Sequence, residues 1–208
     1  MTTTIRTRPG SSEAYREQGV VENRLWWKRG RPAGEPSGEA ALRRAIELSP
    51  ADFDALASLG GILKREQRYA ESLELYGRSV EASGGHAYPL LNGLKVEAHV
   101  TGRLELDETR RFHLERAERP LSLQVADRPP YDAPWSFFDL AEIRLYLGQR
   151  EQFRTLIEEG TRWCTAAWQA TTCWESLQLL VDGGVDLPEL REGMDALLRA
   201  AKRLEEKP

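Results

Sequence analysis

The residue types that most often carry catalysis or bind metals are sparse in this chain. Metal sites need Cys or His ligands at short, fixed spacings, and acid–base catalysis needs two groups that face one another. The adjacent pairs Glu158–Glu159 and Glu205–Glu206 diverge on a helix, so neither forms an acid–base pair. The sequence therefore predicts no catalytic residue, no metal site and no cofactor. Its three histidines, which fall on different predicted elements, are His86, His99 and His113.

Glycine pairs and cysteines offer no other chemistry. Gly60–Gly61 lies inside a predicted helix and Gly183–Gly184 in a predicted hairpin turn, and neither begins a GxGxxG or GxxxxGK phosphate-binding motif. Cys164 and Cys173 are predicted to share one helix, where their nine-residue separation turns the thiols to opposite sides. They are interpreted as buried, reduced thiols of a cytosolic protein.

The charge distribution points to binding. The chain of 208 residues has a net charge of −4, but residues 1–44 hold nine basic and five acidic groups, giving +4 there and −8 elsewhere. Such a basic end suits an acidic partner or nucleic acid, although mixed charges are also ordinary on solvated helix surfaces. No apolar run approaches the ~18 residues of a membrane span, and residues 1–10 lack the apolar stretch of a secretory signal. A cytoplasmic location is expected, and the excess of Arg over Lys indicates a bacterial source.

The elements that must position any functional side chain are all predicted to be helices. Periodic apolar positions alternate with turns rich in Gly and Pro, while residues 1–11 have nothing to bury and are expected to be disordered. An irregular segment is expected over 120–134. The predicted helices cover 12–29, 39–48, 87–101, 107–119, 135–147, 151–159, 162–181 and 187–204, with a helical hairpin over 53–84.

The most specific pattern lies in Phe53–Gly84. Leu59 and Gly60 form a large–small pair on one helix, and Ser72 and Tyr76 share a face of the next. Small residues at such positions let two helices touch, while the large residues fill the space around the contact. This pattern resembles a tetratricopeptide repeat.

The resemblance continues in the preceding unit. Leu42, Ala45 and Pro50 stand where the family places a large residue, a small residue and a terminal proline, which sets repeats over 19–52 and 53–86. Later units resemble the family in period and hairpin form only. The resemblance implies an all-α fold, a right-handed α-solenoid of about five antiparallel helix pairs.

The resemblance also implies a binding function. In this family the first helix of each pair lines a concave groove, so the chain is expected to be a non-enzymatic adaptor or scaffold with one domain over 12–206. The groove is expected to be basic at one end and aromatic at the other, which suits a protein or peptide partner with an acidic segment and an apolar anchor. The groove positions carried over from the family are Asn23, Trp27, Arg31, Asp54, Ala57, Gly61, Lys64, Arg65, Tyr88, Leu91, Lys95, His99, Trp135, Phe138, Glu142, Leu145 and Tyr146.

Three alternatives remain at this stage. Helical-hairpin repeats also bind RNA, but that requires a basic groove along the whole length, whereas most of this chain is net acidic, so neither nucleic acid nor a membrane is the expected partner. The chain could instead be a regulatory subunit of a larger assembly. Finally, aromatic residues at helical spacing fill cores more often than grooves, and Trp163 and Trp174 are expected in the core.

Overall fold

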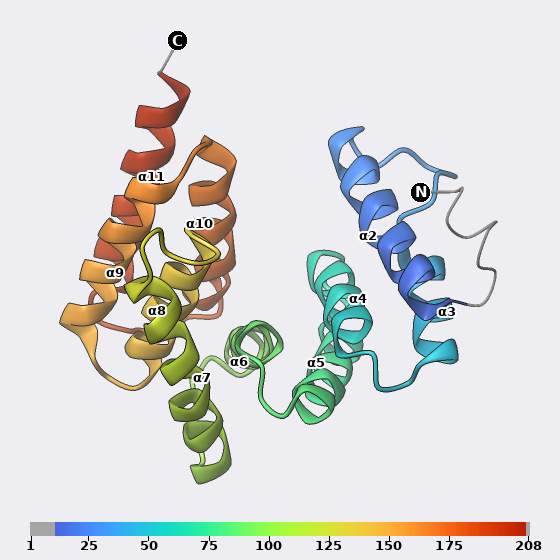
Figure 1. The fold of residues 1–208 in the computed structure, drawn as a ribbon, viewed down its shortest axis with the longest axis horizontal. Helices are drawn as coiled ribbons and strands as arrows, with labels where there is room; N and C mark the ends of the chain where they lie inside the picture. The colour runs from blue at the N-terminus through green and yellow to red at the C-terminus, as the bar shows by residue number, and fades with distance from the viewer. Residues whose placement is uncertain (1–10, 207–208) are drawn as a thin grey trace. The chain divides into compact units, whose positions relative to one another are not determined.

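All regular structure in the described part of the chain is helical. The computed structural model describes residues 11–206, which form ten helices and no strand. The tail expected over 1–11 lies outside these residues, apart from Ser11. The chain divides into two compact units, residues 1–89 and 90–208. Each unit is described by itself below, and Figure 1 colours the chain from blue through green to red.

The first unit is built from two helical hairpins (Figure 1). Helix α2 (Ser12–Lys28) packs against α3 (Glu39–Leu48), and α4 (Phe53–Arg65) packs against α5 (Tyr69–Ser83). The side chain of Asp52 caps α4 by accepting a hydrogen bond from the amide of Ala55 at 3.0 Å. The core between the hairpins is aliphatic and consists mainly of Leu42, Ala45, Leu56, Leu59, Leu63 and Leu75.

The close contact expected between α4 and α5 is present. A methyl group added to Gly60 would lie 3.1 Å from the ring of Tyr76. The hydroxyl of Ser72 donates a hydrogen bond of 2.9 Å to the carbonyl of Gly60. The hydroxyl of Ser79 donates likewise to the carbonyl of Phe53 at 2.8 Å. Small residues therefore let the backbones approach, and Tyr76, 1% exposed, fills the remaining space.

The second unit continues the pattern of packed helix pairs. Helix α8 packs against α9 and α10 against α11, while α7 contacts α8 and α9 contacts α11. Helix α6 crosses the boundary between the units, so that its residues from Leu90 onward belong to the second unit. The helices are α6 (Ala87–Thr101), α7 (Glu108–Ala126), α8 (Trp135–Tyr146), α9 (Arg150–Trp163), α10 (Ala167–Asp182) and α11 (Leu190–Glu205).

The prediction that residues 120–134 are irregular is wrong over its first half, because α7 continues through Pro120 to Ala126. A proline inside a helix removes one backbone hydrogen bond, which usually ends the helix. Here Leu114, Ala117 and Leu121 form one buried stripe on both sides of the proline. The burial of this stripe favours the helical continuation over the local preference of proline.

The prediction of one helix over 162–181 is also wrong, since the chain leaves the helical conformation between Trp163 and Ala167. The side chain of Gln169 stabilises this break by accepting hydrogen bonds from the amides of Thr165 at 2.7 Å and Ala166 at 3.1 Å. The two cysteines therefore lie on different elements, Cys164 at the end of α9 and Cys173 within α10, and both are free thiols.

At two helix contacts, a glycine on one helix makes room for a large side chain on the other helix. Phe153 is a large side chain at a helix contact, yet it is fully buried. The space comes from Gly193 of α11, where an added methyl group would lie 2.5 Å from the Phe153 ring. Gly160 of α9 makes room for Phe138 of α8 in the same way, at 2.8 Å.

Candidate functional site

Four of the residues expected in the groove gather at one place in the first unit, contributed by α2, α4 and the loop after α2. The guanidinium carbon of Arg31 lies 4.9 Å from the centre of the Trp27 ring, and that of Arg65 lies 5.6 Å from the same centre. Arg65 also donates a hydrogen bond from Nη2 to the side-chain oxygen of Asn23. Two cations on one indole form cation–π contacts, which hold the charges at defined positions on the surface.

Burial differs sharply within this cluster. Asn23 is 7% exposed and its amide nitrogen donates to the carbonyl of Ser37 at 2.8 Å, so its orientation is fixed. Both arginines are exposed and Trp27 is half-buried. The indole Nε1 of Trp27 is buried and has no hydrogen-bond partner among residues 11–206. The cluster thus combines a buried side chain of fixed orientation, Asn23, with exposed guanidinium groups.

Tyr88 and Tyr76 lie next to this cluster, within the first unit. Tyr88 is 43% exposed, whereas the Tyr76 side chain is buried. Burial is the main cause that raises the pKa of Tyr76 well above its usual value, and the neighbouring Tyr88 adds to the rise while Arg65 opposes it. The Tyr76 hydroxyl therefore stays protonated at neutral pH and is able to donate a hydrogen bond.

The other expected groove positions of the first unit have different surroundings. The carboxylate of Asp54 is exposed and lies 3.8 Å from the guanidinium of Arg16. Lys64 is half-buried and Ala57 belongs to the core. A partner would meet Asp54 as part of an ion pair, away from the positive cluster.

In the second unit, three expected groove residues bond to one another. Lys95 Nζ lies 2.5 and 2.6 Å from the two carboxylate oxygens of Glu142, and the hydroxyl of Tyr146 donates to the same carboxylate at 2.5 Å. The three side chains are 2%, 7% and 6% exposed, respectively. This arrangement satisfies both charges internally and locks α6 to α8. The role of these residues as partner contacts stays a prediction.

Asp139 extends this network by one helical turn of α8. The pKa of Asp139 is raised to about 7, mainly by burial and then by the nearby Glu142, while Lys95 acts in the opposite direction. Burial likewise raises the pKa of the Cys173 thiol well above its usual range. A protonated thiol is a weak nucleophile, so the group that changes charge near neutral pH here is the Asp139 carboxyl.

The aromatic positions of the second unit are split between core and surface. Phe138 is buried, whereas Trp135 is half-buried, with ring centres 6.1 Å apart. Trp168 of α10 is 59% exposed and its ring centre lies 5.8 Å from that of Trp135. The expectation that Trp163 lies in the core is wrong, because it is 43% exposed where α9 ends.

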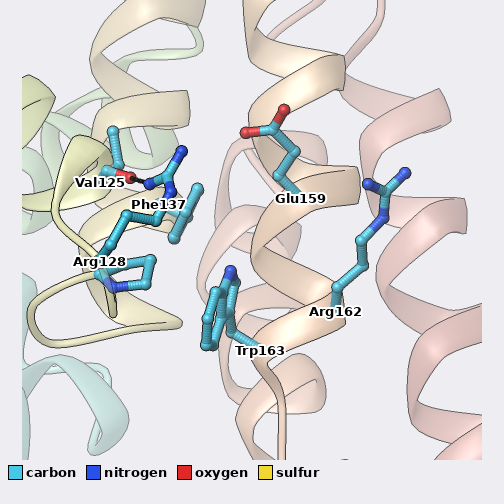
Figure 2. Close-up of a pocket in the computed structure, with 7 residues that line it drawn as sticks. Val125, Arg128, Phe137, Glu159, Arg162 and Trp163 are labelled. Atoms are coloured by element: carbon cyan, nitrogen blue, oxygen red, sulfur yellow. Dashed lines mark hydrogen bonds between the residues drawn. The ribbon is translucent and has the colours of Figure 1, made fainter.

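A surface hollow of about 420 Å³ lies beside Trp163. Figure 2 shows Arg128 and Phe137 on one side of it and Glu159 and Trp163 on the other. Arg128 donates to the carbonyl oxygens of Ala126 at 2.9 Å and Asp127 at 2.8 Å, so this guanidinium caps the end of α7. The hollow is thus lined by aromatic and charged side chains, and one of its two arginines, Arg128, caps α7.

The remaining expected groove positions belong to the packed interior. Two other residues of interest were not predicted from the sequence. Leu91 and Leu145 are buried, and the Nδ1 atom of His99 lies 2.9 Å from the carbonyl oxygen of Leu179. Sequence reasoning missed Trp168 because it assumed a continuous helix there. It also missed Asp139, whose signal was a carboxyl flanked by the apolar residues Phe138 and Leu140 in α8.

Two searches over residues 11–206 gave negative findings. No group of three or more His, Cys, Asp or Glu side chains is arranged to hold a metal ion within this range. Across the same described residues, no helix combines the length and apolar character needed to cross a membrane.

The fold defines the class as an all-α protein of packed helical hairpins. No protein-family model matches the chain. No curated protein matches it either. Among solved structures, it is similar to one titled "Functional Characterization of Pseudomonas Aeruginosa pilF", with a TM-score of 0.47, 16% sequence identity, and coverage of 93% of this chain and 92% of that chain. At this identity and TM-score the likeness says nothing about function, and the fold class rests on the helices themselves.

Proposed function

We propose that this protein is a non-enzymatic, cytoplasmic adaptor that binds a protein or peptide partner on the first unit. The binding surface consists of α2, α4 and the loop after α2. One observation carries the proposal: the exposed guanidiniums of Arg31 and Arg65 gather on the Trp27 indole, and neither has a carboxylate partner among residues 11–206. Such an arrangement supports attraction of an acidic segment by the charges and close packing against the ring.

Two other arginines of the same unit, Arg16 and Arg68, form ion pairs, in contrast to Arg31 and Arg65. Arg16 lies 3.0 Å from Asp52, and Arg68 lies 2.8 Å from Glu39. Their charges are neutralised within the protein and stabilise contacts between helices. Arg31 and Arg65 leave their positive charge available, and exposed charges of this kind mainly raise the rate of encounter with an oppositely charged partner.

The proposal is tested by site-specific photo-cross-linking in the native host. Benzoylphenylalanine at position 31 is expected to form a discrete protein adduct, whereas the same group at position 44, an exposed site on α3, should form none. The adduct at position 31 should weaken when Arg65→Glu is added, because charge reversal slows association, and it should weaken with added salt. Circular dichroism checks that each variant is folded.

Two outcomes would contradict the adaptor. Equal adducts at positions 31 and 44 would mean that this surface is not specific. An adduct removed by nuclease, and not by protease, would replace the protein partner with nucleic acid.

A further inference from the structure

A small space beside Gly61, within α4, is surrounded by polar atoms. A methyl group added to Gly61 would lie 3.4 Å from Tyr88 Oη, 3.6 Å from Tyr76 Oη and 3.9 Å from Arg65 Nη1. The three atoms belong to side chains of α6, α5 and α4, respectively, and glycine adds no side chain to the volume between them. Tyr88 is 43% exposed and Arg65 is also exposed, so two of the three side chains are accessible to solvent.

The guanidinium at this space is held in place from behind. Arg65 Nη2 donates to Asn23 Oδ1, while Asn23 Nδ2 donates to the carbonyl of Ser37 at 2.8 Å. The Trp27 ring lies 5.6 Å from the guanidinium carbon of Arg65. These contacts leave Nη1 as the nitrogen of Arg65 nearest to Gly61. A donor fixed in this way loses little conformational freedom when it binds a ligand.

The groups around this space can donate hydrogen bonds but lack a negative charge. A guanidinium only donates, and a phenol can donate while it accepts another bond. Arg65 has no carboxylate partner among residues 11–206 to neutralise its charge. The complement of such a set is an anionic oxygen, which forms short, charge-assisted hydrogen bonds with these donors.

We infer that the space beside Gly61 is an oxyanion site that binds a carboxylate or phosphate group carried by the peptide partner. The site consists of Gly61, Arg65, Tyr76 and Tyr88, with Asn23 as a positioning residue. An oxygen beside Gly61 accepts from Arg65 Nη1 and from a tyrosine hydroxyl. The inference rests on the proposed adaptor function and names the chemical group that the adaptor recognises.

Two alanine substitutions at helical glycines provide a matched test. Gly61→Ala fills the space, yet its contacts of 3.4 to 3.9 Å are ordinary van der Waals distances, so the fold is expected to survive. Gly77→Ala is the control, because a methyl group at Gly77 of α5 meets nothing within 4 Å. Both changes replace glycine by the best helix former, so both variants should keep or raise the melting temperature.

The measurement is a ¹H–¹⁵N NMR titration of the full chain, followed at the Gly61 amide and the Arg65 Nε–H group. The probes are inorganic phosphate and N-acetylglutamate methylamide, with N-acetylglutamine methylamide as the neutral control at equal ionic strength. Either anion should give saturable shifts at both positions, at least tenfold weaker in Gly61→Ala and within twofold of the parent in Gly77→Ala. The tighter of the two anions identifies the source as a phosphorylated or a carboxylate side chain.

Arg65→Gln supplies a second variant and should abolish the shift of the Gly61 amide without unfolding the chain. The inference is overturned if neither anion binds, if the neutral probe shifts the same signals equally, or if folded Gly61→Ala binds as well as the parent. A photo-adduct at position 31 that Gly61→Ala leaves unchanged would overturn the role of the site in partner binding while the adaptor stands. If instead no protein adduct forms at position 31 while the parent chain still binds either anion, the adaptor function is refuted.

Discussion

Replacing Asp139 by asparagine should stabilise the protein at pH 7.5 and flatten its pH dependence. Asp139 is half-buried in α8, and burial and Glu142 raise its pKa from 3.8 to about 7. Other charged or titratable groups that act on this site are Lys95 of α6, Cys173 of α10 and Asp132 of the preceding loop. In the unfolded chain the carboxyl titrates near pH ~4.

The sign of the effect follows from proton binding. Between pH ~4 and about 7 the folded protein keeps the Asp139 proton that the unfolded chain releases, so this residue makes the free energy of unfolding fall as pH rises. The loss is complete above about pH 7. A shift of about three pKa units at ~1.4 kcal/mol each sets an upper limit of about 4 kcal/mol. Because solvent still reaches the side chain, about 1–2 kcal/mol is expected.

The assay is urea denaturation followed by circular dichroism from pH 5 to 8. Asp139→Asn cannot ionise, so it should exceed the parent in stability at pH 7.5 by about 1–2 kcal/mol, and this difference should shrink steadily as the pH falls to 5. Asp195→Asn removes an exposed carboxyl of α11 and is the control, which should leave the difference curve flat. The reasoning is refuted if Asp139→Asn and the parent keep the same pH slope, or if the variant is less stable at pH 7.5.

Two further substitutions test the packing. Gly60→Leu should cost about 1–3 kcal/mol and lower the melting temperature, because its side chain would enter the Tyr76 ring; an unchanged melt would disprove the close contact. Lys95→Met should cost about 3–5 kcal/mol in urea denaturation, since it leaves Glu142 buried and unpaired. Adding Glu142→Gln should restore at least half of that loss, and no restoration would mean that the charge of Glu142 is not the cause.

Much of the fold was predictable because it depends on short-range patterns. The helix over 39–48 and the hairpin contact of Gly60 with Ser72 and Tyr76 follow from apolar spacing and residue size alone. The cap of Asp107 on α7 follows from local hydrogen bonding and is present at 2.7 Å to the amide of Arg110. Features of this kind are determined within a few residues of chain.

The errors arose where a distant contact outweighed a local preference. Pro120 predicts a helix end, but burial of Leu121 keeps α7 helical. The break after Trp163 depends on Gln169 reaching back to two amides, which no periodicity reveals.

The candidate site shows the same division between local and distant contacts. The resemblance to the repeat family placed Asn23, Trp27 and Arg65 among the expected groove positions. The bond between Lys95 and Glu142 was not predictable, because it joins residues 47 positions apart and requires the packing of α6 on α8. The polar atoms around Gly61 likewise come from three helices, so their convergence appears only after folding.

The pairing of the large Phe153 side chain with Gly193 has a consequence for how the sequences of helical-hairpin proteins change during evolution. At each helix contact the packing constrains the combined volume of two side chains, and it leaves free which helix carries the larger one. A pair of substitutions can therefore move the bulk across the contact and keep the hairpin intact. A sequence profile that requires the small residue at one fixed position will then score the hairpin poorly, although the backbone geometry is the same. Recognition of distant members is better sought in paired positions than in single ones.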